Sequence, residues 1–201
     1  MANVNEIPSD IQPIVDFHGG FDPGIVLGAR LAQAALKAMN RQKGDKDLFV
    51  ISENRRCHLD SIQCVTGCTL GGQKLIVKDF GKTAMSLIDR NTGKGVRVSI
   101  KRGYPPESFG ARLNRGLSRE ESREIVREMA FSLLSEDLDS YILIQRIRLA
   151  EPAPPPPFPA TERTICSVCG ERVMDGLVSG PEGEQKCRNC AQESYYSVEE
   201  L

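Results

Sequence analysis

Four cysteines near the end of the chain have the clearest chemistry. Cys166 and Cys169 form one C-x2-C pair, Cys187 and Cys190 form a second, and 17 residues lie between the pairs. Two thiolate pairs at this spacing can converge on one tetrahedral metal ion, with zinc–sulfur bonds of about 2.3 Å. Four protein ligands leave no position open for water, so the pattern predicts a structural zinc site. Two disulfides or an iron site are the alternatives.

The sequence around these cysteines is typical of a treble-clef or zinc-ribbon finger. Gly170 follows the first pair as in a tight zinc-knuckle turn, and Ala191 follows the second pair where a short helix can begin. Residues 161–201 hold four basic and eight acidic side chains, a net charge of −4 before the thiolates are counted. Because nucleic-acid affinity depends on neutralising phosphates, this charge favours contact with proteins, or covering a site, over binding nucleic acid.

A second group of thiols lies near the middle of the chain. In a helix over residues 57–65, Cys57, Asp60 and Cys64 fall on one face, and Cys68 follows in a turn. Such a set can hold a soft metal ion or form a reactive pair, and the helix N-terminus together with neighbouring arginines is expected to lower the pKa of Cys57. Alternatively, the cysteines are small buried hydrophobes and the carboxylate pairs with an arginine.

Two further side chains are candidates for the same chemistry. His18 stands in a His-Gly-Gly loop, where it suits metal binding or proton transfer, or else hydrogen-bonds a helix end. Lys82 follows a glycine turn that can direct its amine into a cleft, although a solvated lysine is the alternative.

His58 is expected at the surface. The middle of the chain is locally basic, which suits a phosphate-bearing ligand or an acidic partner, or else gives a charged surface. The basic residues of this run are Arg97, Lys101, Arg102, Arg112, Arg115 and Arg119.

The composition predicts one ordinary domain with a small appendage. The chain has 201 residues, 40% of them hydrophobic, and its net charge of −1 gives no overall attraction to nucleic acid or an anionic membrane. It shows no signal-peptide pattern and no apolar run long enough to span a membrane, so we expect a cytoplasmic protein. A proline-rich spacer at residues 151–160 is expected to separate a core domain, 1–150, from the finger, 161–201.

The core pattern predicts an α+β fold rather than regular βαβ winding. Helical spacing covers residues 10–17, 22–39, 57–65 and 118–134, whereas residues 47–52, 74–78, 84–89, 96–101 and 141–149 are typical of strands. We expect a mixed or antiparallel sheet packed with helices. Small residues at Gly28, Ala29, Ala32 and Ala35 allow another helix to approach closely, in an internal contact or a dimer contact.

Four segments of the core resemble the E-subunit family of tungsten or molybdenum formylmethanofuran dehydrogenase. They are His18-Gly19 with Pro23-Gly24, Arg56-Cys57-x-x-Asp60-x-Ile62-Gln63, Thr66-Gly67-Cys68-Thr69-Leu70-Gly71 and Asp79-Phe80-Gly81-Lys82. The resemblance covers about residues 14–149, and some relatives also carry a C-terminal treble-clef zinc finger.

The resemblance implies an α+β core that forms homodimers and gathers these segments around a cleft. Its implied site residues are His18, Cys57, Asp60, Gln63, Cys68 and Lys82, whereas Cys64 is not part of the motif. The usual His-Gly-His-x-Cys-Pro-Gly pattern has Gly20 and Asp22 here in place of the second histidine and the cysteine. A core metal would therefore have fewer protein ligands, with Asp22 as a substitute.

These observations predict an accessory protein of the formylmethanofuran dehydrogenase system, related to one-carbon metabolism and methanogenesis, that binds a metal or cofactor in the core. Oxidoreductase subunits are its expected partners. The sequence has no ferredoxin-type cysteine run and no recognisable pterin-binding module, so catalysis by this chain alone is not predicted. The alternatives are an independent metal- or thiol-dependent enzyme, with Cys57 or Cys68 as nucleophile or ligand, and a zinc-finger interaction or regulatory module.

Overall fold

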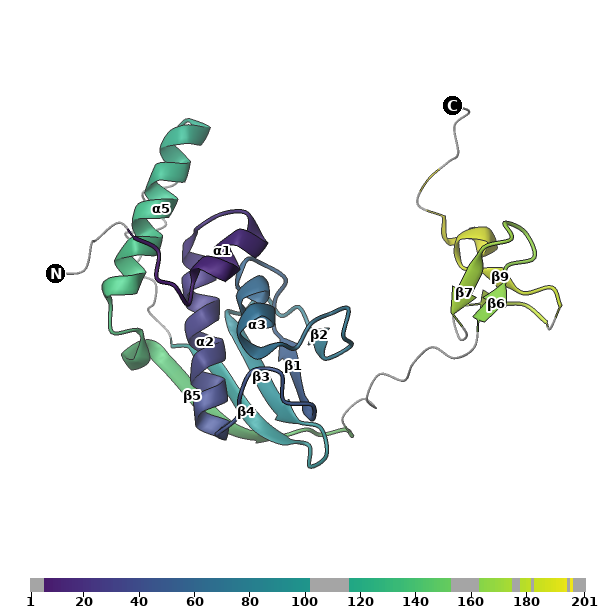
Figure 1. Cartoon of the computed structure of the whole chain (residues 1–201), viewed down its shortest axis with the longest axis horizontal. Coiled ribbons are helices and arrows are strands. Elements are labelled where there is room, and N and C mark those ends of the chain that lie inside the picture. The colour runs from purple at the N-terminus through teal and green to yellow at the C-terminus, as the bar shows by residue number, and fades with distance from the viewer. Residues whose placement is uncertain are drawn as a thin grey trace. The chain divides into compact units, whose positions relative to one another are not determined.

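The computed structural model describes residues 6–101, 116–152, 163–174, 178–181, 183–194 and 196 (Figure 1). Tertiary contacts divide the chain into two compact units, Met1–Pro156 and Pro157–Leu201. Most of the proline-rich spacer, from residue 153 onward, lies outside the described residues. In the described part of the chain, no helix combines the length and apolar character needed to cross a membrane.

The first unit has four described α-helices, a short 3-10 turn and five strands. The helices are α1 (Gln12–His18), α2 (Pro23–Met39), α3 (His58–Thr66) and α5 (Arg119–Ser135), and the turn η1 is Leu138–Tyr141. The strands are β1 (Leu48–Ser52), β2 (Leu75–Val77), β3 (Ala84–Asp89), β4 (Lys94–Ile100) and β5 (Ile142–Arg148). This order confirms the predicted α+β class.

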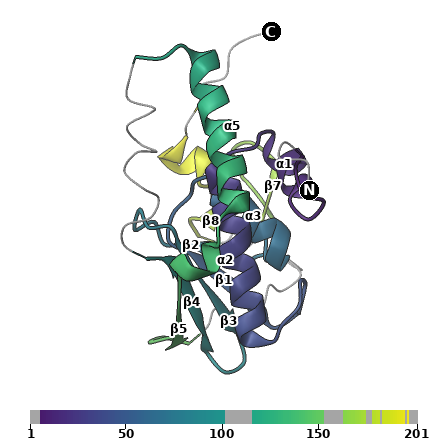
Figure 2. The same ribbon diagram turned by 90° about the vertical axis from the view of Figure 1, so that its left-hand side faces the viewer.

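The five strands form one mixed sheet in the order β2-β1-β3-β4-β5. β1 and β2 are parallel and joined through α3, whereas the other neighbours are antiparallel. Alternate residues such as Leu48, Val50 and Val98 point to the side where α2 and α3 pack, and they form the main hydrophobic cluster. Figure 2 shows α2 running across this face, with β5 extending beyond it. The sheet and α2 together form the rigid frame of the unit.

Local sequence signals fix where the two longest helices begin. Asp22 caps α2, because its Oδ1 accepts hydrogen bonds from the backbone N–H groups of Gly24 at 2.7 Å and Ile25 at 3.2 Å. Ser118 and Glu121 form the predicted capping box at the start of α5. The cap on α2 also places the Asp22 carboxylate beside His18, the last residue of α1.

The small residues of α2 are used inside the molecule, against α3. A Cβ atom added at Gly28 would lie 2.6 Å from the backbone of His58, so only glycine permits this approach. The close contact buries His58, which is 3% exposed. The expectation that His58 lies at the surface was wrong, because the gap left by Gly28 draws the first turn of α3 against α2.

Buried His58 predicts an acid-sensitive core. Burial lowers its pKa to about 4 from 6.5. Between these values the unfolded chain binds a proton that the folded chain does not, so stability falls as the pH drops from 6.5 to 4. The loss attributable to this residue reaches about 3 kcal/mol at most.

Because Nε2 of His58 has no partner in the described structure, His58→Leu should lessen the sensitivity of the core to acid. Hydrogen exchange of α3 amides at pH 7 and pH 5 measures this, and equal losses in both proteins would contradict it.

The described part of the second unit contains two short hairpins and one helical turn. β6 (Arg163–Ile165) pairs with β7 (Arg172–Met174), and β8 (Val178–Ser179) pairs with β9 (Lys186–Cys187), both antiparallel. The turn η2 spans Asn189–Glu193. The first C-x2-C pair follows β6, whereas Cys187 is the last residue of β9 and Cys190 lies in η2. This order of elements is similar to that of the expected treble-clef finger.

Candidate metal centre

The four C-terminal cysteines converge as their spacing predicts. Their Sγ atoms all lie within 4.8 Å of one another. Gly170, with φ of +73°, allows the tight turn after the first pair, and its N–H donates to the Cys166 carbonyl at 3.0 Å. Zinc–sulfur bonds of about 2.3 Å require sulfurs about 3.8 Å apart, so a small contraction is enough to close the site around an ion.

The electrostatics of this cluster fit a bound cation. Backbone N–H donors, those of Cys169 and Cys187 first, lower the pKa of Cys166 to about 6, whereas hydrogen bonding with Cys187 raises the pKa of Cys190 to about 12. The pocket thus stabilises one thiolate, and further negative charge needs a positive ion between the sulfurs. All four cysteines are free thiols in this structure. The cluster can accordingly hold a metal ion such as zinc.

A second set of ligand atoms meets in the core, where α1, α2 and α3 come together. Nε2 or Nδ1 of His18, a carboxylate oxygen of Asp22 and Sγ of Cys57 lie within 4.8 Å of one another. His18 is the last residue of α1, Asp22 is the cap of α2, and Cys57 directly precedes α3. Three helix termini therefore position the three groups, and the side chains of His18 and Asp22 are 23% and 21% exposed, so solvent reaches them.

The imidazole of His18 lies between two carboxylates. Its Nδ1 is 2.7 Å from Oδ2 of Asp60, and its Nε2 is 3.2 Å from Oδ2 of Asp22. A neutral imidazole can donate through only one nitrogen. Either the ring is doubly protonated, or Nδ1 donates to Asp60 while the Nε2 lone pair and Asp22 face a shared cation. The second arrangement is the carboxylate–histidine–metal geometry common in metalloproteins.

Cys57 is not an activated nucleophile in this environment. Burial raises the pKa of its thiol, and the negative charge of Asp22 and a hydrogen bond with it raise the pKa further. The expectation that the helix N-terminus and nearby arginines lower this pKa was wrong; Arg55 instead pairs with Asp79 at 2.9 Å. A metal ion that replaces the proton would stabilise the thiolate form of this cysteine.

The remaining candidates are not brought together with His18. Cys68 is 1% exposed in the main hydrophobic cluster, and its Sγ faces the Leu48 carbonyl at 3.6 Å. It lies beyond the opposite end of α3 from Cys57, and nine helical residues span about 14 Å. The convergence of Cys57 and Cys68 that a two-thiol enzyme requires is therefore absent, and Cys68 fills the role of a small buried hydrophobe.

Gln63 and Lys82 have different surroundings. Gln63 is a support for the site, since its Nε2 donates to Asp60 at 3.4 Å and its Oε1 accepts from the Leu70 N–H at 3.0 Å. Lys82 is exposed, with its ammonium 5.8 Å from the centre of the Phe80 ring. Cys64 is half-buried and lies outside the ligand cluster.

The three described members of the predicted basic run have separate surroundings. Arg97 is tied to Glu53, with Nε–Oε1 and Nη2–Oε2 distances of 2.6 and 2.8 Å, and Lys101 donates to the Ser140 carbonyl at 2.7 Å. Arg119 begins α5, whereas the other members, Arg102, Arg112 and Arg115, lie outside the described residues. The described part of the run serves packing and surface contacts.

The core sequence matches a known protein family. The model of FmdE, described as "Molybdenum formylmethanofuran dehydrogenase operon", matches residues 17–142, which include His18, Asp22, Cys57 and Asp60. The chain belongs to the FmdE family. The match begins beside the first ligand of the candidate metal centre and ends at the first residue of β5, so it covers the described core from the end of α1 to the start of β5.

Two relatives extend the similarity over nearly the whole FmdE-family chain. One is a tungsten formylmethanofuran dehydrogenase FmdE-like protein from Syntrophus aciditrophicus, known from its crystal structure. It is 26% identical with a TM-score of 0.63, and the match covers 93% of this chain and 92% of that one. A probable S-adenosyl-L-methionine-binding protein from Archaeoglobus fulgidus is 29% identical over 205 residues, 91% of this chain and 52% of the relative. The chain thus spans about half the length of that curated relative.

Proposed function

We propose that this FmdE-family chain is an accessory protein of the formylmethanofuran dehydrogenase system whose core binds a metal ion through His18, Asp22 and Cys57. Family membership supports the accessory role. The metal site rests on one observation: three ligand atoms from three different helix termini lie within 4.8 Å of one another, with Asp60 on the far nitrogen of the histidine.

The donor set indicates the class of metal. One nitrogen, one oxygen and one sulfur ligand suit zinc or a comparable first-row divalent ion better than calcium or magnesium, which prefer oxygen alone. Three protein ligands leave at least one coordination position for water or a bound molecule. The site would thus differ from the closed four-cysteine site, since the partly exposed His18 and Asp22 leave the metal within reach of a ligand.

Each residue has a separate role in this proposal. Asp60 accepts from Nδ1 and keeps the Nε2 lone pair directed at the metal position, and Gln63 holds Asp60. Asp22 uses one oxygen to cap α2 and the other toward the metal position. The substitution of aspartate for the family's cysteine therefore preserves a ligand rather than deleting one.

We also propose the finer features expected from the sequence. These are zinc as the ion of the four-cysteine site, core and finger domains at residues 1–150 and 161–201, and a homodimer that contacts oxidoreductase subunits. The acidic charge of the finger supports contact with proteins.

Metal titration of the purified full-length chain tests the core site. With the four-cysteine site already filled with zinc, Cys57→Ser should weaken core binding of Co²⁺ strongly and remove the thiolate-to-cobalt absorption of the core site, and Asp60→Asn should weaken core binding by roughly 10- to 100-fold. Cys64→Ser is the matched control, because this cysteine lies in α3, the helix that Cys57 precedes, but outside the ligand cluster. Equal effects of Cys57→Ser and Cys64→Ser, or none from either, would remove the proposal.

A further inference from the structure

A groove with an apolar half and a basic half runs between α2 and the edge strand β5. One hollow of about 580 Å³ is lined by Ala34 and Ala38 of α2 and by Ile142 and Ile144 of β5, together with the polar side chains of Arg30, Gln33, Lys37 and Asp139. An adjoining hollow of about 580 Å³ shares Ala38 and is lined by Arg41, Lys94, Arg146 and Arg148. Volumes of this size are typical of small-molecule sites.

The fold itself forms the groove. Ile142, Ile144, Arg146 and Arg148 alternate along β5 and point to the sheet face on which α2 packs. Because α2 lies over the central strands, it covers Ile142, which is 8% exposed, but leaves Ile144 45% exposed. Figure 2 shows this uncovered side of β5 beside α2. The lining residues belong mostly to a helix and two strands, so the groove is preformed rather than assembled by loops.

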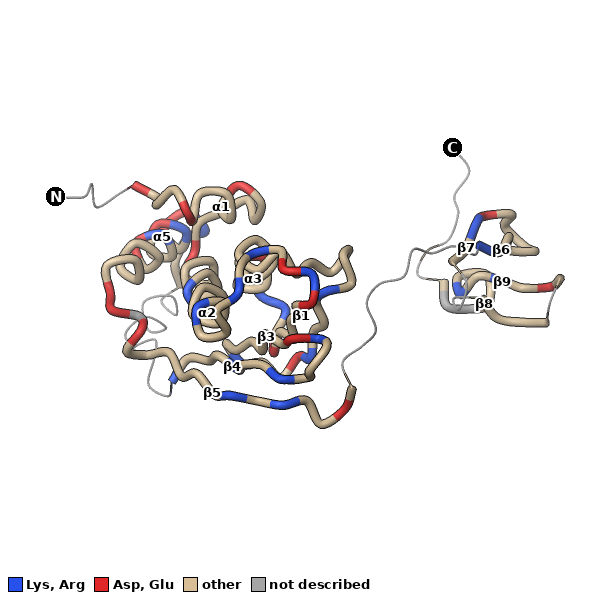
Figure 3. Tube along the Cα trace, turned by 60° about the horizontal axis from the view of Figure 1, so that its bottom comes forward, with Lys and Arg blue, Asp and Glu red and all other residues tan. Residues whose placement is uncertain are grey.

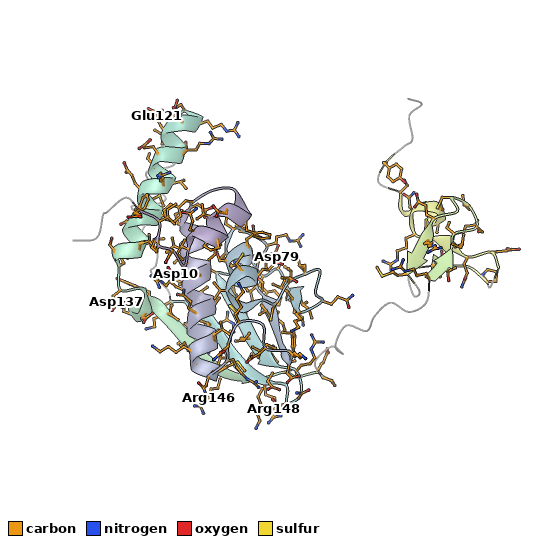
Figure 4. All side chains as sticks on the ribbon, viewed as in Figure 1. Asp10, Asp79, Glu121, Asp137, Arg146 and Arg148 are labelled. Atoms are coloured by element: carbon orange, nitrogen blue, oxygen red, sulfur yellow. The ribbon has the colours of Figure 1, made fainter. Side chains whose placement is uncertain are left out.

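The basic half places like charges together. Lys94 and Arg148 are direct cross-strand partners, a pairing of like charges that destabilises a sheet. Arg146 and Arg148 point to the same side about 7 Å apart along the strand, and Figure 4 shows both at the end of β5 near the end of α2. In the tube of Figure 3, the blue Lys and Arg positions along β5 have no red Asp or Glu position between them.

Few acidic groups offset these charges within the described residues. Asp89 is the acidic residue that lines the basic half, and it is already paired with Arg41. Arg148 donates to the Thr92 carbonyl at 3.4 Å, which leaves its charge uncompensated. At the end of α2 beside them, the N–H groups of Asn40 and Arg41 donate to the carbonyls of Leu36 and Lys37.

We propose that this groove binds a small organic phosphate, with the phosphate on Arg146, Arg148 and Lys94 and an apolar body over Ala38 and Ile144. Arginine forks bind phosphate oxygens in pairs, and the adjoining hollow supplies the apolar contact. The site is separate from the metal centre: His18 and Asp22 lie at the start of α2, and the groove's basic half lies at its end, about 25 Å away along a helix of 17 residues.

Adenosine monophosphate is a suitable probe, because it combines one phosphate with a planar body. Calorimetric titration of the full-length, metal-loaded chain at low salt should show saturable binding of this probe that is tighter than the binding of inorganic phosphate or adenosine alone. Arg146→Ala/Arg148→Ala should weaken it by roughly tenfold or more. Ile144→Ser should weaken the binding of adenosine monophosphate and leave that of inorganic phosphate unchanged.

The control removes the same charge elsewhere. Arg119→Ala/Arg123→Ala changes two exposed arginines of α5 and should leave binding intact. Equal weakening by the two double variants would show general charge attraction and overturn the proposal. Amide shifts in the unmodified chain give an independent answer even where a variant folds poorly: they should centre on Arg41, Lys94, Arg146 and Arg148. The proposal would also be overturned by amide shifts at His18 and Asp22 instead, or by the absence of saturable binding. A dimer that buries β5 and excludes the probe would overturn it as well.

Discussion

Cys187→Ser is expected to unfold the C-terminal unit while the core stays folded. The described part of this unit has little buried apolar surface: Cys166 is its one buried hydrophobic residue there, whereas Ile165, Val168 and Met174 are 54%, 61% and 52% exposed. A metal ion bound by the four cysteines would therefore supply the stability that a hydrophobic core gives in larger domains, since binding of structural zinc supplies about 10–16 kcal/mol in small fingers. Loss of one of the four ligands is expected to remove most of this binding free energy.

Amide hydrogen exchange on the full-length chain measures this unfolding unit by unit. Protection at β6, β7 and β9 should disappear in Cys187→Ser and after treatment of the unmodified chain with a zinc chelator, while protection in β3 and β4 persists. Cys57→Ser is the matched control, since it removes a cysteine from the core and should leave the finger protected. A finger that stays protected in the chelated chain but unfolds on reduction would instead mean that disulfides hold it.

Arg97→Met is expected to destabilise the core by about 3 kcal/mol at pH 7. The Arg97 guanidinium binds both oxygens of Glu53, whose side chain is 8% exposed, and it also reaches Ser99 and Gln145 at 3.3 and 3.2 Å. Without Arg97, the buried Glu53 carboxylate loses its hydrogen-bonded partner and keeps the weaker attraction of the Lys82 charge. Glu53 follows β1 directly and precedes the loop to Cys57, so the pair also anchors that loop on β4.

The pH dependence of this effect follows from Glu53. The hydrogen bond from Arg97 holds the pKa of Glu53 below 4.5. The stabilisation is therefore complete above pH 4.5 and disappears as the pH falls through the lowered pKa. Urea unfolding at pH 7 and pH 3.5 should show a smaller difference between Arg97→Met and the unmodified chain at the lower pH. Glu53→Gln/Arg97→Met should recover much of the lost stability at pH 7. If the double variant were as unstable as the single one, an unpaired charge would not be the cause.

Much of the fold could be predicted from local sequence patterns. Asp22, Ser118 and the turn at Asn91–Gly95 depend on residues close in sequence, and each sets an element boundary that the structure shows. The two C-x2-C pairs are equally local, because two hairpins bring them together. Such features require no knowledge of how distant segments pack.

The features that sequence reasoning missed depend on packing between distant segments. The burial of His58 follows from Gly28, 30 residues earlier, and the pairing of Arg97 with Glu53 joins positions 44 residues apart. The family resemblance also implied that Cys68 and Cys57 share a site, although α3 separates them. Asp22 is the instructive case: its cap role was local, whereas its position beside His18 and Cys57 needed three helix termini to meet.

Metal content per chain tests the central claim most directly. Elemental analysis of the full-length protein, purified without added metal, should give about two metal ions per chain, one at the cysteine cluster and one at the core. Cys57→Ser and His18→Ala should each reduce this to about one, with the finger as an internal reference, and Cys64→Ser should keep two. One ion per chain in all four proteins would contradict a metal centre at His18, Asp22 and Cys57 and would leave the finger as the single metal site.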